Sequence, residues 1–124
     1  MYLRYTLCFI TRDDQILMLY RRNPPNQGLW NGVGGRLEEG ESARECVLRE
    51  VREETGFLLP DVHFAGILTW DGFETPPGGL YIFTAAAPEG EPVACLEGPL
   101  EAAKLGFFIP RGRLQYSPVW PPGA

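Results

Sequence analysis

The segment Gly34–Phe57, GGRLEEGESARECVLREVREETGF, constrains the fold most, because it contains the one strong helix signal in the chain. Ser42 is a favourable N-cap residue, and Glu45 three residues later completes a capping box. Gly56 suits the position just beyond a helix, where the backbone turns left-handed. We therefore predict one helix from Ser42 to Thr55.

One side of this predicted helix is apolar, and three carboxylates lie at the edge of that side. At about 100° per residue, the residues expected to face the core are Ala43, Val47, Leu48 and Val51. The three glutamates that fall beside this stripe, rather than on the opposite wet side, are Glu50, Glu53 and Glu54. Carboxylates that are buried without partners are costly, so a positive group must compensate for them.

Two kinds of positive group could provide this compensation. Arginines such as Arg49 could pair with the glutamates on a solvated helix face, which is the common situation for a charge-rich helix. A divalent cation such as Mg²⁺ or Mn²⁺ is the alternative, because both ions prefer hard oxygen ligands. The loop before the helix favours the cation, since Gly34, Gly35 and Gly40 let backbone carbonyls approach a ligand closely.

The rest of the chain is typical of short strands separated by turns. Six β-prone runs are expected to form strands: Tyr5–Ile10, Ile16–Tyr20, Leu29–Val33, Val62–Trp70, Leu80–Ala87 and Phe107–Ile109. A short helix could form at Glu101–Lys104, and the proline-rich tail should be irregular. Because strands outnumber helices, we expect an α+β fold with a mixed sheet. The length of 124 residues predicts a single domain over residues 1–124.

Composition argues against several classes of protein. The formal net charge of −5 disfavours binding to a nucleic-acid polymer, although a single nucleotide could bind through a bridging cation. The apolar runs are too short for a transmembrane helix, and the first residues do not resemble a secretory leader. Cys8, Cys46 and Cys95 lack the spacing of a disulfide framework or zinc site. We therefore expect a cytoplasmic protein that acts on a small molecule, as a monomer or homodimer.

The helix and its preceding loop resemble the Nudix box. This motif is a glycine, five residues, a glutamate, seven residues, and then Arg-Glu-apolar-x-Glu-Glu-x-Gly-apolar. Every defined position matches, and the matching residues are Gly35, Glu41, Arg49, Glu50, Val51, Glu53, Glu54, Gly56 and Phe57. The resemblance implies the Nudix fold, a mixed β-sheet sandwiched between α-helices (an α/β/α sandwich). It also implies hydrolysis of a nucleoside diphosphate linked to another group, with Mg²⁺ or Mn²⁺ as cofactor.

The resemblance also implies roles for individual residues of the box. The metal ligands would be the carbonyl of Gly35 and the carboxylates of Glu50, Glu53 and Glu54. The residues implied in catalysis are Arg49, which would orient the carboxylates by ion pairing, and Glu50 and Glu53. Which glutamate is the general base stays open. The structural positions of the motif would be Gly34, Glu41 and Gly56.

One further acid is expected beyond the box. Relatives of the MutT type carry such an acid in a loop similar to the stretch EGEP…EG found here at residues 89–98. This similarity predicts Glu97 as an additional metal ligand or base, with Glu101 as its competitor. After Leu100 the chain departs from the family pattern, and the role of that segment stays open.

The run LWNGVGGRLE resembles the branch of the family that hydrolyses nucleoside triphosphates, including oxidised purine nucleotides. Asn31 would hydrogen-bond the base, because its amide can donate and accept, and a turn asparagine is the alternative. The other expected substrate contacts are Arg21, Arg22 and Trp30, for which a buried position in the sheet is the alternative. We expect a (d)NTP, with an oxidised one such as 8-oxo-dGTP included, to give the monophosphate and pyrophosphate. The alternatives are ADP-ribose, a dinucleoside polyphosphate, or a nucleotide-sensing domain without catalysis.

Overall fold

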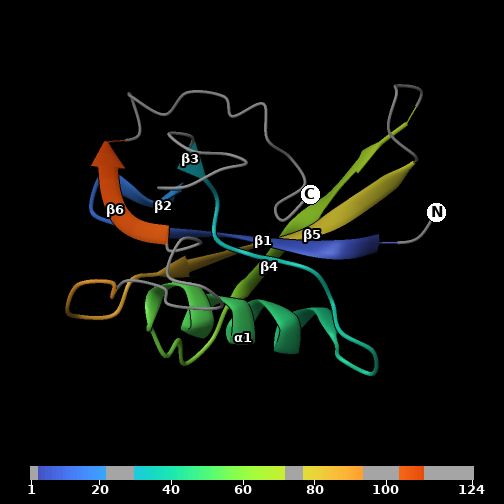
Figure 1. Cartoon of the computed structure of the whole chain (residues 1–124), viewed down its shortest axis with the longest axis horizontal. Coiled ribbons are helices and arrows are strands. Elements are labelled where there is room, and N and C mark those ends of the chain that lie inside the picture. Colours follow the sequence, from blue (N-terminus) through green and yellow to red (C-terminus); the bar gives the residue numbers. More distant parts are fainter. Residues whose placement is uncertain (1–2, 22–29, 72–76, 94–103, 111–124) are drawn as a thin grey trace.

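The computed structural model describes residues 3–21, 30–71, 77–93 and 104–110. Within these ranges lie six strands and one helix (Figure 1). In chain order they are β1 (Leu3–Arg12), β2 (Gln15–Arg21), β3 (Trp30–Asn31), α1 (Ala43–Thr55), β4 (His63–Trp70), β5 (Gly78–Ala86) and β6 (Lys104–Pro110).

The strands form one mixed sheet, in the order β3-β2-β1-β5-β4, with β6 paired to β2. β1 and β5 run parallel, and the other pairs are antiparallel. β1 and β2 form an antiparallel hairpin, and its turn contains Asp13 at a φ of 53°. Aspartate tolerates this left-handed conformation better than most residues. The predicted α+β class with a mixed sheet is therefore confirmed.

The helix α1 lies against one face of the sheet, where it packs on β1 and β6 (Figure 1). Alternate residues of β1 are buried, as expected for a strand with one face in the core: Thr6, Cys8 and Ile10. From the helix, Val47 and Val51 are fully buried, and Ala43 and Leu48 pack at the margin of the same core. The predicted apolar side of the helix is thus confirmed, and it orients the neighbouring carboxylates.

Some predicted boundaries differ from the structure. The strand expected at 29–33 is only Trp30–Asn31, after which single bridges join Val33 to Cys8 and Arg36 to Tyr5. Lys104 does not end a helix as predicted, because it begins β6, which pairs with β2 along seven positions. Residues 101–103 and the tail lie outside the described ranges. Within those ranges α1 is the one helix, and it is too short and too polar to span a membrane.

Candidate functional site

The caps of α1 set the position of the candidate site. The hydroxyl of Ser42 accepts a hydrogen bond from the backbone N–H of Glu45 at 3.1 Å, and the Glu45 carboxylate accepts from the Ser42 N–H at 3.0 Å. The predicted capping box is therefore confirmed. At the other end, Gly56 has a φ of 79°, and its N–H donates to the carbonyl of Arg52. Both ends are fixed by local chemistry, which holds the glutamate-bearing turns in place.

The loop before the helix runs beside β1 and brings its glycines up to the glutamates. Thr6 and Gly35 exchange two backbone hydrogen bonds, of 2.8 and 3.1 Å. Gly34 has a φ of 154°, and a Cβ there would collide with the backbone of Thr6. A Cβ on Gly35 would collide with the carboxylate of Glu50. The missing side chain of Gly35 therefore creates the space in which that carboxylate lies.

The three helix glutamates differ in burial. Glu54 is almost fully buried, at 3% exposure, and its carboxylate accepts a hydrogen bond of 2.9 Å from the Gly34 N–H. The side chains of Glu50 and Glu53 are 15% and 33% exposed. Glu54 therefore joins the helix to the glycine loop, while the other two carboxylates lie nearer the surface.

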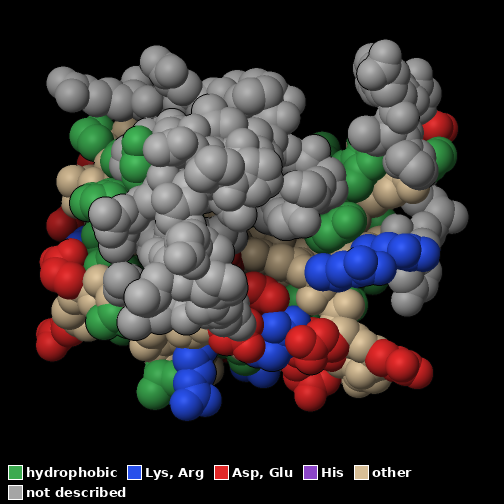
Figure 2. Space-filling view, in the orientation of Figure 1, with side chains coloured by type: hydrophobic (Ala, Val, Ile, Leu, Met, Phe, Trp, Pro, Cys, Tyr) green, Lys and Arg blue, Asp and Glu red, His purple; other side chains and the backbone are tan. Residues whose placement is uncertain are grey.

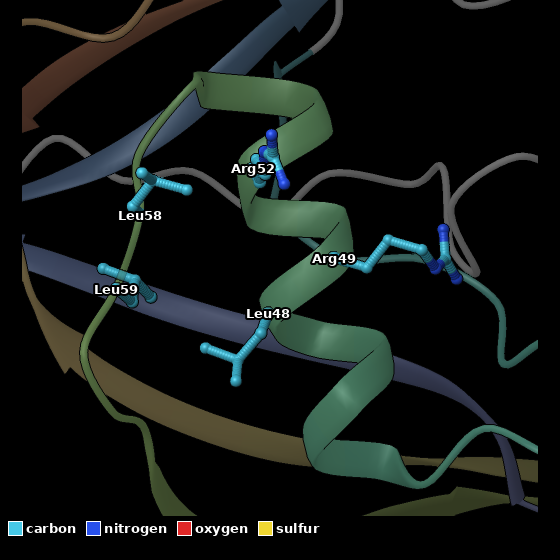
Figure 3. A pocket seen from close by; sticks show the side chains of 5 residues that line it. All are labelled: Leu48, Arg49, Arg52, Leu58 and Leu59. Atoms are coloured by element: carbon cyan, nitrogen blue, oxygen red, sulfur yellow. The ribbon is translucent and has the colours of Figure 1, made fainter.

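Arg49 binds these carboxylates to the loop. Its guanidinium donates to Glu41 at 2.7 and 2.9 Å, to Glu50 at 2.8 Å and to Glu53 at 3.1 Å. A further N–H donates to the Arg36 carbonyl at 3.1 Å. In Figure 3 the Arg49 side chain extends away from Leu58 and Leu59, toward the loop. One guanidinium thus hydrogen-bonds to three carboxylates, from the loop and from two turns of the helix, and forms an ion pair with a fourth, Glu38, at 3.6 Å.

The electrostatics of this cluster follow from the shared guanidinium. The hydrogen bond from Arg49 lowers the pKa of Glu41 to about 2, from an ordinary value of 4.5. The same bond, with that to Glu50, raises the pKa of Arg49. Both groups are therefore charged throughout the physiological range. Glu41 also accepts a hydrogen bond from the Glu38 N–H at 3.0 Å. Its carboxylate therefore links two residues of the loop and also links the loop to the helix.

The donor set suits a hard divalent cation. Carboxylate oxygens and a backbone carbonyl are the ligands that Mg²⁺ and Mn²⁺ prefer. The Glu50 carboxylate occupies the space that a side chain on Gly35 would fill, so a helix carboxylate lies next to the backbone of the glycine loop. Among the described residues, no three acidic, histidine or cysteine side chains already form a cation cage. In this arrangement the carboxylates of Glu50 and Glu53 bond to Arg49.

Two cavities adjoin the helix and its loop. One, of about 410 Å³, lies beside the loop and is lined by Arg4, Arg36, Leu37, Glu38, Glu39, Gly40 and Glu41. Figure 2 shows acidic and basic side chains gathered over this part of the molecule. The other, of about 260 Å³, is more apolar and lies on the opposite side of α1 (Figure 3), lined by Leu48, Arg49, Arg52, Leu58 and Leu59. Each cavity is lined by one defined position of the motif, Glu41 in the first and Arg49 in the second.

The expected substrate contacts are only partly described. Asn31 is buried at 5% exposure, and its side-chain oxygen has no hydrogen-bond partner within the described ranges. Trp30 and Arg21 lie in β3 and β2, but their side chains are not described. Arg22 and Glu97 lie outside the described ranges. The structure therefore brings the box residues together and leaves these other predictions untested.

Sequence reasoning missed two residues that contact the glycine loop. The Thr6 hydroxyl donates to the Gly35 carbonyl at 3.2 Å, and it lies 3.4 Å from the sulfur of Cys46. Both side chains are fully buried, and burial raises the pKa of the Cys46 thiol to about 11. A threonine on a strand and a cysteine on a helix give no local signal of this contact, because 40 residues separate them.

A model of the NUDIX domain family matches residues 1–122. The uncharacterized Nudix hydrolase YvcI of Bacillus subtilis is 40% identical over 67 residues, which are 54% of this chain and 40% of that protein. The oxidized purine nucleoside triphosphate hydrolase of Mus musculus is 29% identical over 89 residues, 71% of this chain and 57% of that one. The chain therefore spans only about half the length of these relatives.

The fold is also similar to that of a solved structure. The MutT NUDIX hydrolase from Burkholderia pseudomallei has a TM-score of 0.75 and 22% identity, and the match covers 94% of this chain and 88% of that one. At this level of identity the similarity concerns the fold. Together with the family match over nearly the whole sequence, it shows that this chain belongs to the NUDIX domain family.

Proposed function

We propose that this chain hydrolyses a nucleoside diphosphate linked to another group, and that its substrate is a (d)NTP, oxidised forms included. The products would be the (d)NMP and pyrophosphate, and the cofactor Mg²⁺ or Mn²⁺. The observation that carries the proposal is the cluster in which Arg49 holds Glu41, Glu50 and Glu53 next to the Gly35 loop. Family membership supports it, because Nudix hydrolases generally use divalent metal ions. We further propose a single domain that works in the cytoplasm.

The proposed ligands of the cation are oxygen atoms from the loop and the helix: the Gly35 carbonyl and the carboxylates of Glu50, Glu53 and Glu54. Glu97 is proposed as an additional ligand or base. A divalent cation held there would neutralise the phosphates, polarise phosphorus and acidify a water molecule. Glu54 already bonds to the Gly34 N–H, so it would also keep the loop carbonyl close to the helix.

The chain's own part in the reaction is to orient groups and accept a proton. In hydrolysis, the oxygen of water forms a bond to phosphorus, and the bond from phosphorus to the bridging oxygen breaks. The proton of the water passes to a carboxylate, for which Glu50 and Glu53 are the candidates. Arg49 holds both by hydrogen bonds, so their oxygens are directed before the substrate binds.

Asn31 is the proposed base-reading residue. A buried side-chain oxygen without a partner is costly, and such atoms in native proteins call for an explanation. An exocyclic amine or ring N–H of a purine would satisfy it, and the amide N–H₂ could donate to a ring acceptor. Trp30, Arg21 and Arg22 stay proposed contacts to the base and the phosphates.

A nucleotide panel tests the proposal. The wild-type chain should release pyrophosphate from one or more (d)NTPs in Mg²⁺ or Mn²⁺, and EDTA should abolish the release. Glu53→Gln keeps the shape of the side chain and should reduce turnover about 10²- to 10⁴-fold, with little change in thermal melting. Glu89→Gln is the matched control, because Glu89 is an exposed residue with the same charge that lines neither of the two cavities.

The panel should also include ADP-ribose and dinucleoside polyphosphates. If the chain cleaved only these compounds, the proposed hydrolase activity would stand and the proposed (d)NTP substrate would be wrong. Normal turnover in Glu53→Gln would remove the proposed metal site. Nucleotide binding without any cleavage would favour a sensing domain.

A further inference from the structure

The strand β4 carries large apolar side chains that the fold leaves exposed. Phe64, Ile67 and Leu68 are 61%, 55% and 49% exposed. They are three of the six large apolar side chains that are exposed in the described ranges, and all three lie on this one strand. Single exposed apolar residues are ordinary, whereas a group of them on one element marks an interaction surface.

The position of β4 in the sheet explains this exposure. Among the described strands, β4 pairs with β5 alone, so it forms an edge of the sheet (Figure 1). The helix α1 packs instead on β1, which β5 separates from β4, and on β6. Ile67 lies opposite Tyr81 on β5, and Leu68 lies opposite Leu80. Since successive residues of a strand point to opposite faces, the edge is apolar on both faces of the sheet.

The sequence of β4 lacks most of the features that keep sheet edges apart. Its eight residues, HFAGILTW, include no lysine, arginine, aspartate, glutamate or proline. One protective feature is present, a β-bulge between Phe64 and Gly66. From Gly66 to Trp70 the pairing with β5 is regular at five successive positions. The outer backbone groups of this stretch are therefore aligned for pairing with a further strand.

A second copy of the chain fits this edge. Two β4 strands related by a twofold axis would pair antiparallel, with the same residues contributed by each copy. Such pairing sets only uncharged residues against each other, although the chain as a whole has a net charge of −5. An axis near the middle of Gly66–Trp70 would bring Ile67 and Leu68 of both copies close together.

The length of the edge limits the strength of the association. Five strand residues span about 17 Å. With the exposed apolar side chains of both copies included, the contact covers on the order of 1,000 Å², at the low end for specific interfaces. We propose that two copies of the chain associate reversibly, at micromolar concentrations, by antiparallel pairing of their β4 edges. This inference does not rest on the proposed function, because β5 and β1 separate β4 from the glycine loop.

Sedimentation equilibrium over about 1–500 µM chain tests the proposal. The wild type should pass from monomer to dimer, and Ile67→Lys should lower the association constant at least about tenfold, because it sets two like charges near the axis. Leu68→Lys repeats the test on the other face of the strand. Leu58→Lys is the matched control, since Leu58 is an exposed residue that lies outside β4, and it should leave association unchanged. Thermal melting checks that each variant is folded.

Two further measurements identify the kind of contact. Raising NaCl from about 50 to about 500 mM should strengthen wild-type association, because salt screens the repulsion between two acidic chains. Amide hydrogen exchange of the peptide covering residues 63–70 should slow as the wild-type concentration rises, and should not do so in Ile67→Lys.

Three results would overturn the inference. The first is a wild type that stays monomeric over the whole concentration range. The second is a dimer that survives both lysine substitutions in β4, since its contact would then lie elsewhere on the chain. The third is a dimer that Ile67→Lys disrupts but in which exchange at residues 63–70 does not depend on concentration, since the strands would then not be paired.

Discussion

Replacing Arg49 by alanine should destabilise the cation-free chain and should do so in a pH-dependent way. The substitution removes the guanidinium that Glu41, Glu50 and Glu53 share. Breaking a buried ion pair costs roughly 3–5 kcal/mol, and the Arg49 side chain is 23% exposed, so solvent screens part of the loss. We therefore expect about 2–3 kcal/mol at pH 7, or roughly 10 °C in melting temperature for a domain of this size.

The pH dependence follows from Glu41. Its pKa is about 2 in the folded chain against an ordinary 4.5, because Arg49 hydrogen-bonds to it. A lowered carboxylate pKa adds stability that is fully present above pH 4.5 and is lost as the pH falls to about 2. Each pKa unit corresponds to about 1.4 kcal/mol before screening. The Arg49→Ala chain lacks this contribution at every pH. The difference in free energy of unfolding between the wild type and Arg49→Ala should therefore fall, by pH 3, to about half of its value at pH 7.

The assay is urea unfolding of both chains at pH 7 and pH 3, in EDTA. Arg52→Ala is the matched control, because Arg52 is exposed on the same helix, and it should change stability by about 0.5 kcal/mol or less at both pH values. Mn²⁺ should rescue part of the loss in Arg49→Ala, since the ion supplies the missing positive charge. An equal loss at pH 7 and pH 3 would refute the reasoning.

Two other perturbations separate fold from site. Gly34→Ala should unfold the chain, because the φ of 154° at Gly34 and the nearby Thr6 backbone leave no room for a side chain. Gly35→Ala should stay folded, but it should displace the Glu50 carboxylate and weaken Mn²⁺ binding about tenfold or more. Equal melting temperatures of the two variants would contradict this. Asn31→Ala should raise the KM for the preferred nucleotide about tenfold with little loss of stability, and an unchanged KM in steady-state assays would assign Asn31 to the fold alone.

The helix could be predicted because its signals are local. Ser42, Glu45 and Gly56 act within a few residues, and the spacing of Val47 and Val51 reports the buried side directly. The same helical spacing places the three carboxylates beside the buried side, and Glu54 is the most buried of them. A family match over nearly the whole chain shows that the resemblance read from this segment was correct.

The contacts that could not be predicted join residues far apart in the sequence. Thr6 and Gly35 are 29 positions apart, and Thr6 and Cys46 are 40. Their meeting depends on how the loop lies along β1, which periodicity does not encode. Lys104 shows the same limit, because its local sequence favoured the end of a short helix, whereas the residue begins β6, which pairs with β2 at seven positions. Tertiary pairing overrides weak local preference in both cases.

The position of Arg49 explains how one helix can carry so many carboxylates and still fold before a cation arrives. The guanidinium donates hydrogen bonds to Glu41, Glu50 and Glu53. Its positive charge reduces the repulsion among these carboxylates enough for the helix to form. A helix that relied on the cation alone would couple its folding to metal supply. Removing Arg49 should create that coupling, which is why the cation-free and manganese-loaded stabilities of Arg49→Ala should differ more than those of the wild type.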